Sequence, residues 1–283
     1  METLAGEKAF LHPKGMKFLR FLALFSLFFS TFAHGGESDP EATNAGWTAL
    51  PSGRAFGVLP SDPRDLKLGL RGNNKSEIEG DVGGYRSLVG WSGNGCRLTA
   101  GIEGAAYFQM RKEGARFPLQ SSDGLFGLYG ETSHGPWAWQ LRFTHISAHV
   151  SDGLTAVRPA FVYSREFLAL RLKRELEWLT AYAGYQFLVS TKPTLPRHTL
   201  QLGAYSILPM HWGIAHPYFG ADLRVRGAEE GTTFMIGTGV AFVSEHGVPP
   251  VRLTASYLKG HDLRGQFYME KTEKWIFGLD LDL

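Results

Sequence analysis

The sequence has only one cysteine, Cys96, among its 283 residues, so no disulfide can form within the chain. Long apolar runs are equally scarce. Beyond residue 33 no segment approaches the about 18 consecutive apolar residues that a membrane-spanning helix needs. Charges of the two signs nearly balance, with 29 Lys and Arg against 27 Asp and Glu, which gives no indication of a nucleic-acid partner. These features argue against a disulfide scaffold, a helical membrane protein in the mature chain and a basic nucleic-acid-binding protein.

The one pronounced apolar run lies near the start of the chain, over residues 18–32, and two lysines precede it. Such a basic start, apolar core and small-residue end are typical of a secretory signal peptide, which we expect over residues 1–33. Met16 is a more usual starting point for this signal, which would make residues 1–15 a start-site artefact. No cysteine lies near the expected cleavage site, which argues against a lipid-anchored protein.

Residues 137–150 show the clearest structural pattern, an alternation of apolar and polar side chains. The apolar positions are Trp137, Trp139, Leu141 and Phe143, and the intervening polar positions include Gln140, Arg142 and Thr144. Alternation with period two predicts a β-strand that has one apolar face and one polar face. At about 14 residues the strand is longer than the usual globular length of about 5–6 residues, but it fits a tilted strand that crosses a membrane.

Similar alternation recurs along the chain and predicts about twelve strands, an even number as in bacterial single-chain barrels. We therefore expect an all-β protein, a transmembrane antiparallel up-and-down β-barrel over residues 64–283, preceded by a periplasmic leader over residues 34–63. The expected strands lie near residues 65–70, 85–91, 96–110, 124–132, 137–150, 160–173, 177–189, 198–206, 216–226, 232–243, 251–259 and 273–283.

The connections support this interpretation, because tight turns alternate with longer polar loops through the first half of the chain, as periplasmic turns and extracellular loops do. The polar faces of the strands also carry charges, which suit an ion-paired or water-filled lumen and would be costly against lipid. The set leans basic, which would favour anions if a channel is open. It comprises Arg97, Glu103, Arg142, Arg171, Lys173, Asp222, Arg224, Arg252, Asp280 and Asp282.

The last segment, residues 273–283, places Trp275 and four further apolar residues on one face, with Gly278 between them. It resembles the C-terminal signal that outer-membrane barrels present to the barrel-assembly machinery, although it ends on Leu283 instead of an aromatic residue. The resemblance implies that this machinery is a partner and that outer-membrane lipids and lipopolysaccharide surround the barrel.

Four stretches resemble a family of Gram-negative outer-membrane proteins known as domain of unknown function 1207. They are Leu50–Arg64, Gly101-Ile-Glu-Gly-Ala105, His145-Ile-Ser-Ala-His149 and Gly265-Gln-Phe-Tyr268. The resemblance extends over nearly the whole mature chain. It implies a location in the outer membrane of a Gram-negative bacterium and carries no activity with it.

His145 and Ser147 resemble the His-x-Ser motif of outer-membrane phospholipase A, which is itself a twelve-stranded barrel, and more loosely the lipid A deacylase motif. Residues two apart on a strand share a face, so His145 could activate Ser147 as a nucleophile. The phospholipases follow the serine with Asn-Gly and take an orienting Asn from the next strand. Here Ala148 and His149 follow, and Glu166 of the next strand is the candidate for the orienting role. The resemblance implies calcium as a cofactor only if the protein is such a hydrolase.

Other polar residues give weaker indications. His145 and His149 lie four strand residues, or about 13 Å, apart, which is too far to share one metal ion. Basic residues near the expected outer loops could contact lipopolysaccharide phosphates; these are Arg71, Lys112, Arg116 and Arg158. Three hypotheses therefore remain open: an outer-membrane barrel of unknown activity with a narrow or side-chain-filled pore, an outer-leaflet lipid acyl hydrolase, and a soluble secreted β protein with a sandwich fold.

Overall fold

The computed structural model describes residues 45–154, 161–227, 231–243 and 250–282. The expected signal peptide lies outside these ranges and stays a prediction. No helix within the described ranges is both long and apolar enough to cross a membrane.

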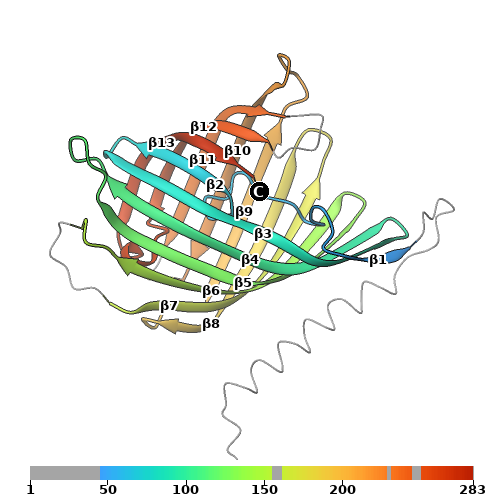
Figure 1. Cartoon of the computed structure of the whole chain (residues 1–283), viewed down its shortest axis with the longest axis horizontal. Coiled ribbons are helices and arrows are strands. Elements are labelled where there is room, and N and C mark those ends of the chain that lie inside the picture. The colour runs from blue at the N-terminus through green and yellow to red at the C-terminus, as the bar shows by residue number, and fades with distance from the viewer. Residues whose placement is uncertain (1–44, 155–160, 228–230, 244–249, 283) are drawn as a thin grey trace, which may run out of the picture.

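Thirteen strands and one short 3-10 helix make up the described structure (Figure 1). The strands are β1 Gly46–Ala49, β2 Leu68–Asn73, β3 Glu77–Gly93, β4 Cys96–Arg111, β5 Leu119–His134, β6 Trp137–Val150, β7 Tyr163–Glu175, β8 Thr180–Lys192, β9 His198–Ile207, β10 Ala215–Arg226, β11 Thr232–Phe242, β12 Val251–His261 and β13 Lys271–Leu281, and the helix η1 spans Gly265–Phe267.

Strands β2 to β13 form a closed antiparallel barrel. Each strand pairs with its neighbours in the chain, and the ring closes where β2 pairs with β13, with Leu68 opposite Leu281 and Asn73 opposite Ile276. The predicted twelve-stranded up-and-down barrel is confirmed, and the alternative of a β-sandwich is wrong. The short strand β1 was not predicted. It pairs with Val89–Ser92 of β3, next to the part of β3 that pairs with β2.

Alternation along each strand separates an apolar outer face from a polar lumen. On β6, Gln140, Arg142 and Thr144 are buried inside the barrel, while the outward residues from Trp137 onward stay partly exposed. Outward apolar residues on other strands are well exposed, as with Leu202 of β9 at 58%. A barrel with this distribution has the fold of a membrane-spanning protein, since lipid covers the apolar face and the polar groups turn inward.

Strand β3 differs most from the expectation, because the strand was expected only near residues 85–91, after one of the longer polar loops at residues 73–82. The chain instead turns at 74–76, and β3 begins at Glu77. Its early charged residues are the lumen-facing half of an alternating strand: Asp81 binds Arg71, and Glu79 binds Lys274. In sequence these charges resemble a polar loop because their oppositely charged partners lie on other strands, Arg71 on β2 and Lys274 on β13.

A tight turn was predicted between the strands now seen as β3 and β4, and the residue types at this turn explain why it forms. Asn94 and Gly95 both adopt positive φ angles, 51° and 69°. These values suit the mirror-image turn that two-residue hairpins favour, and an Asn-Gly pair adopts them at little steric cost. The turn fixes the register of the two longest neighbouring strands.

Residues 50–67, which we call the lumen segment, connect β1 to β2 by passing inside the ring of strands (Figure 1). Its apolar residues Phe56, Leu59 and Leu66 are almost fully buried. Its polar atoms contact strands on several sides: the Phe56 backbone N–H donates to Glu131 of β5 at 3.1 Å, and Ser61 lies 3.0 Å from the Tyr182 hydroxyl of β8. The interior of the barrel is therefore filled by the chain itself.

Asp62 is the central ionic contact of the lumen segment. Its carboxylate accepts from Arg171 of β7 at 3.0 Å and from Arg224 of β10, and its side chain has no exposed surface. Asp65 adds a second contact to Arg171 at 3.1 Å and accepts from the Tyr85 hydroxyl at 2.7 Å. Charged groups so deeply buried are tolerated because opposite charges and hydrogen bonds surround them.

The expected division into a periplasmic leader over residues 34–63 and an outer-membrane barrel over residues 64–283 stays a prediction. Within the described residues, the second half of that leader lies inside the barrel, and the barrel wall begins at Leu68.

The loop between β12 and β13 folds back over the lumen at the end opposite the β3–β4 turn. The Gly265 backbone N–H donates to Asp123 of β5 at 3.0 Å, and the Gln266 side chain donates to the carbonyl groups of Ala148 and Phe161. Burial alone raises the pKa of Asp262 in this loop, but the Arg264 guanidinium outweighs it and holds that pKa below its usual value. The loop is thus tied to three wall segments and narrows this end of the barrel.

A charge on the outer face should destabilise the barrel. Leu202→Arg places a cation on the outward face near the middle of β9, where we expect a loss of roughly 2–4 kcal/mol if the site is near the bilayer midplane. The matched control is Met210→Arg in the β9–β10 turn, because Met210 is equally exposed at 59% but lies outside the strands. Urea unfolding in lipid vesicles measures both. Equal stability of the two variants would contradict a lipid-facing β9.

Removal of the Asp62 carboxylate should destabilise the filled barrel. Asp62→Ala leaves Arg171 and Arg224 without their shared partner, and breaking a buried pair in this way costs about 3–5 kcal/mol. Glu273→Ala is the control, because Glu273 pairs with Lys259 on the exposed surface, where solvent screens the pair and its contribution to stability is small. Similar unfolding free energies for the two variants would show that the lumen segment does not stabilise the barrel.

Candidate functional site

The sequence-predicted site residues lie on the outer face of β6 and β7, close to the loop end of the barrel. β6 runs from its tight turn at Trp137 to Val150, so His145 and Ser147 fall in its last third. The side chains inside the barrel at this level are Thr144 and Ala148, both buried, whereas His145 and Ser147 keep partial exposure. Their alternation places both side chains toward the surroundings of the barrel and away from the lumen.

Glu166 of β7 lies directly opposite His145 in the strand register. The imidazole Nδ1 is 3.1 Å from the Glu166 Oε1, with side-chain exposures of 27% and 31%. An ionised carboxylate can only accept, so the hydrogen bond requires the proton of the imidazole to be on Nδ1. That tautomer leaves Nε2 as the basic nitrogen of His145.

A second contact holds the imidazole from the other side. The ring of Phe126 on β5, which lies opposite His145 in the register, is 4.9 Å from the imidazole centroid at an angle of 36°. His145 is thus placed between an aromatic ring on β5 and a carboxylate on β7. A catalytic base needs such support, because its ring must keep one orientation during proton transfer.

Ser147 has open space beside it. Its register partners are Gly124 on β5 and Ser164 on β7. A Cβ atom placed on Gly124 would lie 3.7 Å from the Ser147 hydroxyl oxygen, so the glycine leaves that side of the serine uncovered. No hydrogen bond joins His145 to Ser147 among the described residues, and catalytic contacts of this kind often tighten only when substrate binds.

The arrangement has the parts of a serine nucleophile system: a hydroxyl, an imidazole on the same strand face and a carboxylate that fixes the imidazole tautomer. The structure brings His145 and Glu166 into contact and places Ser147 next along the same face. The catalytic role of these three residues stays a prediction.

The residues near this site do not fit a dedicated calcium site. No group of three His, Cys, Asp or Glu side chains within the described ranges is arranged to hold a metal ion. Calcium binds through several oxygen ligands, usually including carboxylates. We therefore derive no step through calcium.

The four basic residues that were suggested for contact with lipopolysaccharide do not lie together. Arg71 was predicted to lie near the outer loops, and it lies two residues before the end of β2. Its guanidinium points into the barrel, where it contacts Asp81 at 2.7 Å and Asp280 at 2.8 Å. Lys112 and Arg116 are exposed in the β4–β5 connection, and Arg158 lies outside the described residues. The Arg71 side chain faces the lumen because the alternation along β2 turns it toward two carboxylates.

Phe126 and Gly124 were not singled out from the sequence, although they flank His145 and Ser147. Their strand was expected at residues 124–132, which includes both, but the register between strands cannot be read from one strand alone. The pairing of β5 with β6 is what places these residues beside the His-x-Ser motif.

Comparisons with known proteins find similarity of fold. No protein-family model matches the chain, and no curated protein matches it in sequence. The resemblance to domain of unknown function 1207 therefore stays a prediction. Among solved structures, the outer membrane phospholipase A of Escherichia coli superposes with a TM-score of 0.51 at 14% identity and covers 76% of this chain and 92% of the enzyme.

A second similar structure is the outer membrane phospholipase dimer of Salmonella typhi, solved with bound calcium. It has a TM-score of 0.51 and 15% identity, and the match covers 78% of this chain and 93% of that chain. Identities this low show a shared architecture and do not transfer an activity. The chain therefore has the closed β-barrel fold of outer-membrane proteins, similar to that of outer membrane phospholipase A.

Proposed function

We propose that this protein is an outer-membrane serine hydrolase that cleaves acyl esters of lipids in the outer leaflet. Ser147 is the nucleophile, His145 is the general base and Glu166 orients the imidazole. The proposal includes a location in the outer membrane of a Gram-negative bacterium, with membrane lipids and lipopolysaccharide around the barrel and delivery by the barrel-assembly machinery through β13.

The contact between His145 Nδ1 and Glu166 Oε1, at 3.1 Å on the outer face, carries the proposal. In sequence, His145 and Ser147 resemble the phospholipase pair but lack the orienting Asn on the next strand. The Glu166 carboxylate on β7 is the group that could take the role of that Asn. A carboxylate serves the role well, because it fixes the tautomer and stabilises the imidazolium that forms during the reaction.

The position of the site also supports a lipid substrate. His145 and Ser147 face outward in the loop-side half of β6. We expect the apolar surface of the barrel to meet the lipid headgroups near this level. Lipid esters lie at this boundary, between the acyl chains and the headgroup. A bound lipid could lay its chains on the outward Phe143 and Leu141 of the same strand.

The reaction follows from the roles of the residues. The Ser147 hydroxyl oxygen attacks the ester carbonyl while Nε2 of His145 accepts the hydroxyl proton. The imidazolium then gives this proton to the leaving alcohol, and an acyl-serine remains. Water, deprotonated by the same nitrogen, attacks the acyl-serine and releases the fatty acid, and the proton returns to Ser147.

An open pore is less well supported than a hydrolase. The lumen segment and the ion pairs on the inner face of the wall occupy space that a solute would need. One such pair is Arg142 and Glu103, in which Arg142 donates to the Glu103 carboxylate through Nε at 2.8 Å and through Nη2 at 3.0 Å. The predicted lumen charges thus serve mainly to bind one another, and we do not assign transport to the barrel.

The outward placement of Ser147 can be tested by labelling in a Cys96→Ser background. A cysteine at position 147 should react with a lipid-soluble maleimide in vesicles, because the residue faces the bilayer boundary. A cysteine at Ala148 is the matched control and should stay unlabelled, since Ala148 is small, adjacent and buried inside the barrel at 2% exposure. The reverse labelling pattern would place the motif in the lumen and remove the lipid substrate.

The hydrolase itself is tested with purified protein in detergent, incubated with a phospholipid or with lipid A, each with calcium and with a chelator. We expect release of fatty acid that Ser147→Ala and His145→Ala each abolish, while Glu166→Gln slows it by roughly a hundredfold or more, because the imidazole loses its carboxylate.

His149→Ala is the control for histidine loss, since His149 is on the same face of β6 but beyond the serine. It should keep nearly full activity, and the heat-modifiable mobility of each variant confirms folding. No fatty-acid release by the unchanged protein from either lipid, or undiminished release by Ser147→Ala, would overturn the proposal.

A further inference from the structure

A pocket inside the barrel, separate from the outer-face site, is lined by an unusual number of arginines. It lies in the loop-side half of the lumen, between the ends of β7 and β10 and the β12–β13 loop. Its cavity volume is about 80 Å³. Among the residues that the structure describes, the lining includes six arginines and one carboxylate, Asp123; the arginines are Arg64, Arg142, Arg165, Arg171, Arg224 and Arg226.

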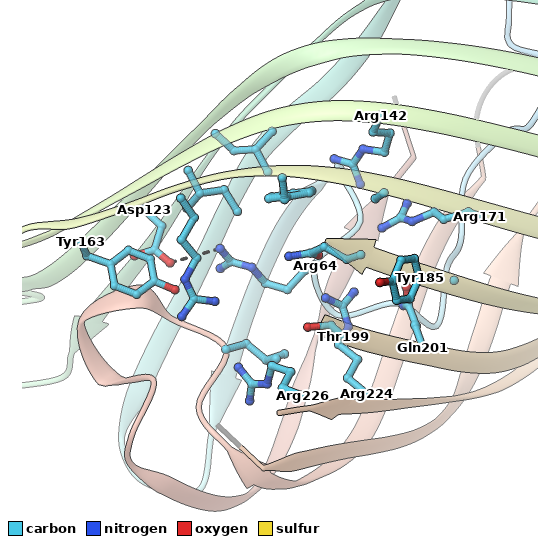
Figure 2. A pocket seen from close by; sticks show the side chains of 18 residues that line it. Arg64, Asp123, Arg142, Tyr163, Arg171, Tyr185, Thr199, Gln201, Arg224 and Arg226 are labelled. Carbon is cyan, nitrogen blue, oxygen red and sulfur yellow. Dashed lines mark hydrogen bonds and ion pairs between the residues drawn. The ribbon is translucent and has the colours of Figure 1, made fainter. Parts of the chain in front are cut away.

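The arginines come from separate parts of the chain and meet around one space. Arg64 belongs to the lumen segment, Arg142 to β6, Arg171 to β7 and Arg224 to β10. Figure 2 shows these side chains entering from different sides, with the guanidinium groups of Arg64 and Arg224 pointing into the space between the strands. Such convergence brings hydrogen-bond donors to one point from several directions.

Carboxylates hold three of these guanidinium groups in place from behind. Arg64 contacts Asp123 through Nη2 at 3.1 Å, and Arg142 contacts Glu103 through Nε and Nη2. Arg224 contacts Asp222 through Nε at 3.3 Å and Asp62 through Nη2. A group fixed in this way loses little side-chain entropy when it binds a ligand, because most of that entropy is already lost on folding.

One nitrogen of each of these three groups remains available. Within the described chain, Nη1 of Arg64, of Arg142 and of Arg224 makes no hydrogen bond to another protein atom. Each guanidinium carries five N–H donors, so the bonds to carboxylates leave donors that can turn toward a ligand. The three side chains are nevertheless mostly buried, at 13%, 3% and 13% exposure.

We propose that this pocket binds a phosphate-type oxyanion. Guanidinium groups recognise phosphate oxygens through charge-assisted hydrogen bonds that are about twice as strong as neutral ones. Donors that arrive from several directions match a tetrahedral anion, whose oxygens point in several directions, better than a planar carboxylate, whose oxygens share one plane. The inference does not rest on the proposed hydrolase, since the pocket faces the lumen and His145, Ser147 and Glu166 face outward.

The phosphate could belong to a small solute that enters from the loop side or to a lipopolysaccharide headgroup that reaches into the barrel mouth. Both offer the same oxyanion to the arginines. Binding of inorganic phosphate, with or without competition from lipopolysaccharide, distinguishes the two sources.

The test is titration of the folded, purified full-length protein in detergent with inorganic phosphate, followed by calorimetry and by phosphorus NMR line width. We expect saturable binding to one site. Arg64→Gln removes a guanidinium with one carboxylate contact and should weaken the affinity by about tenfold or more. Arg97→Gln is the charge-matched control, because Arg97 lies at the turn end of β4, outside the pocket, and should leave the affinity unchanged.

A second variant keeps every arginine. Thr199→Glu introduces a carboxylate from β9 on the pocket wall, where it should occupy the guanidinium groups and abolish phosphate binding. This variant decides the question if Arg64→Gln fails to fold, as judged by heat-modifiable mobility. Displacement of phosphate by lipopolysaccharide would assign the site to a headgroup, and failure to displace it would assign the site to a free solute. Absence of saturable phosphate binding, or unchanged affinity in Thr199→Glu, would overturn the proposal.

Discussion

The closure of the wall is the constraint on which the rest of the structure depends. In lipid, every backbone N–H and C=O group of a spanning strand must find its partner within the protein, so a sheet cannot end in an open edge. Pairing of β2 with β13 removes that edge. Because β2 has only six residues, β1 pairs with β3 beside it, and the chain between the two short strands is free to enter the lumen.

The lumen is held by electrostatics in the place where a soluble protein would have an apolar core. Asp62 connects the lumen segment to β7 and β10. The pair Arg142–Glu103 joins β6 to β4 past β5, and Arg71–Asp280 joins the neighbouring strands β2 and β13 on the inner face of the wall. A charge inside the barrel needs its partner, since an unpaired buried charge is far more costly than a paired one. The result is an ion-paired interior in which, among the described residues, arginines outnumber carboxylates along one pocket.

The two candidate sites lie on opposite faces of the same strands. On β6, His145 turns outward toward lipid while Arg142 turns inward toward the arginine pocket. On β7, Glu166 likewise faces outward and Arg171 faces the lumen. Alternation thus lets one wall carry the proposed nucleophile system on its outer face and the proposed anion pocket on its inner face, because successive residues of a strand point to opposite faces.

The sequence by itself determined the barrel, its twelve strands and the faces of those strands, because alternation is a local property that one strand displays in full. It also predicted His145, Ser147 and Glu166 as neighbours, since parity and antiparallel order place them on one face. Only the tertiary structure decided what lies across from each residue. These contacts depend on strand register and on charges that lie far apart in the chain. Examples are the contact of Phe126 with His145, the ion pair of Arg71 with Asp280 and the ion pair of Asp62 with Arg171 in the lumen. Residues 50–67 show no alternation from which their position inside the barrel could be predicted, because a segment that fills a cavity follows the shape and charge of the wall around it.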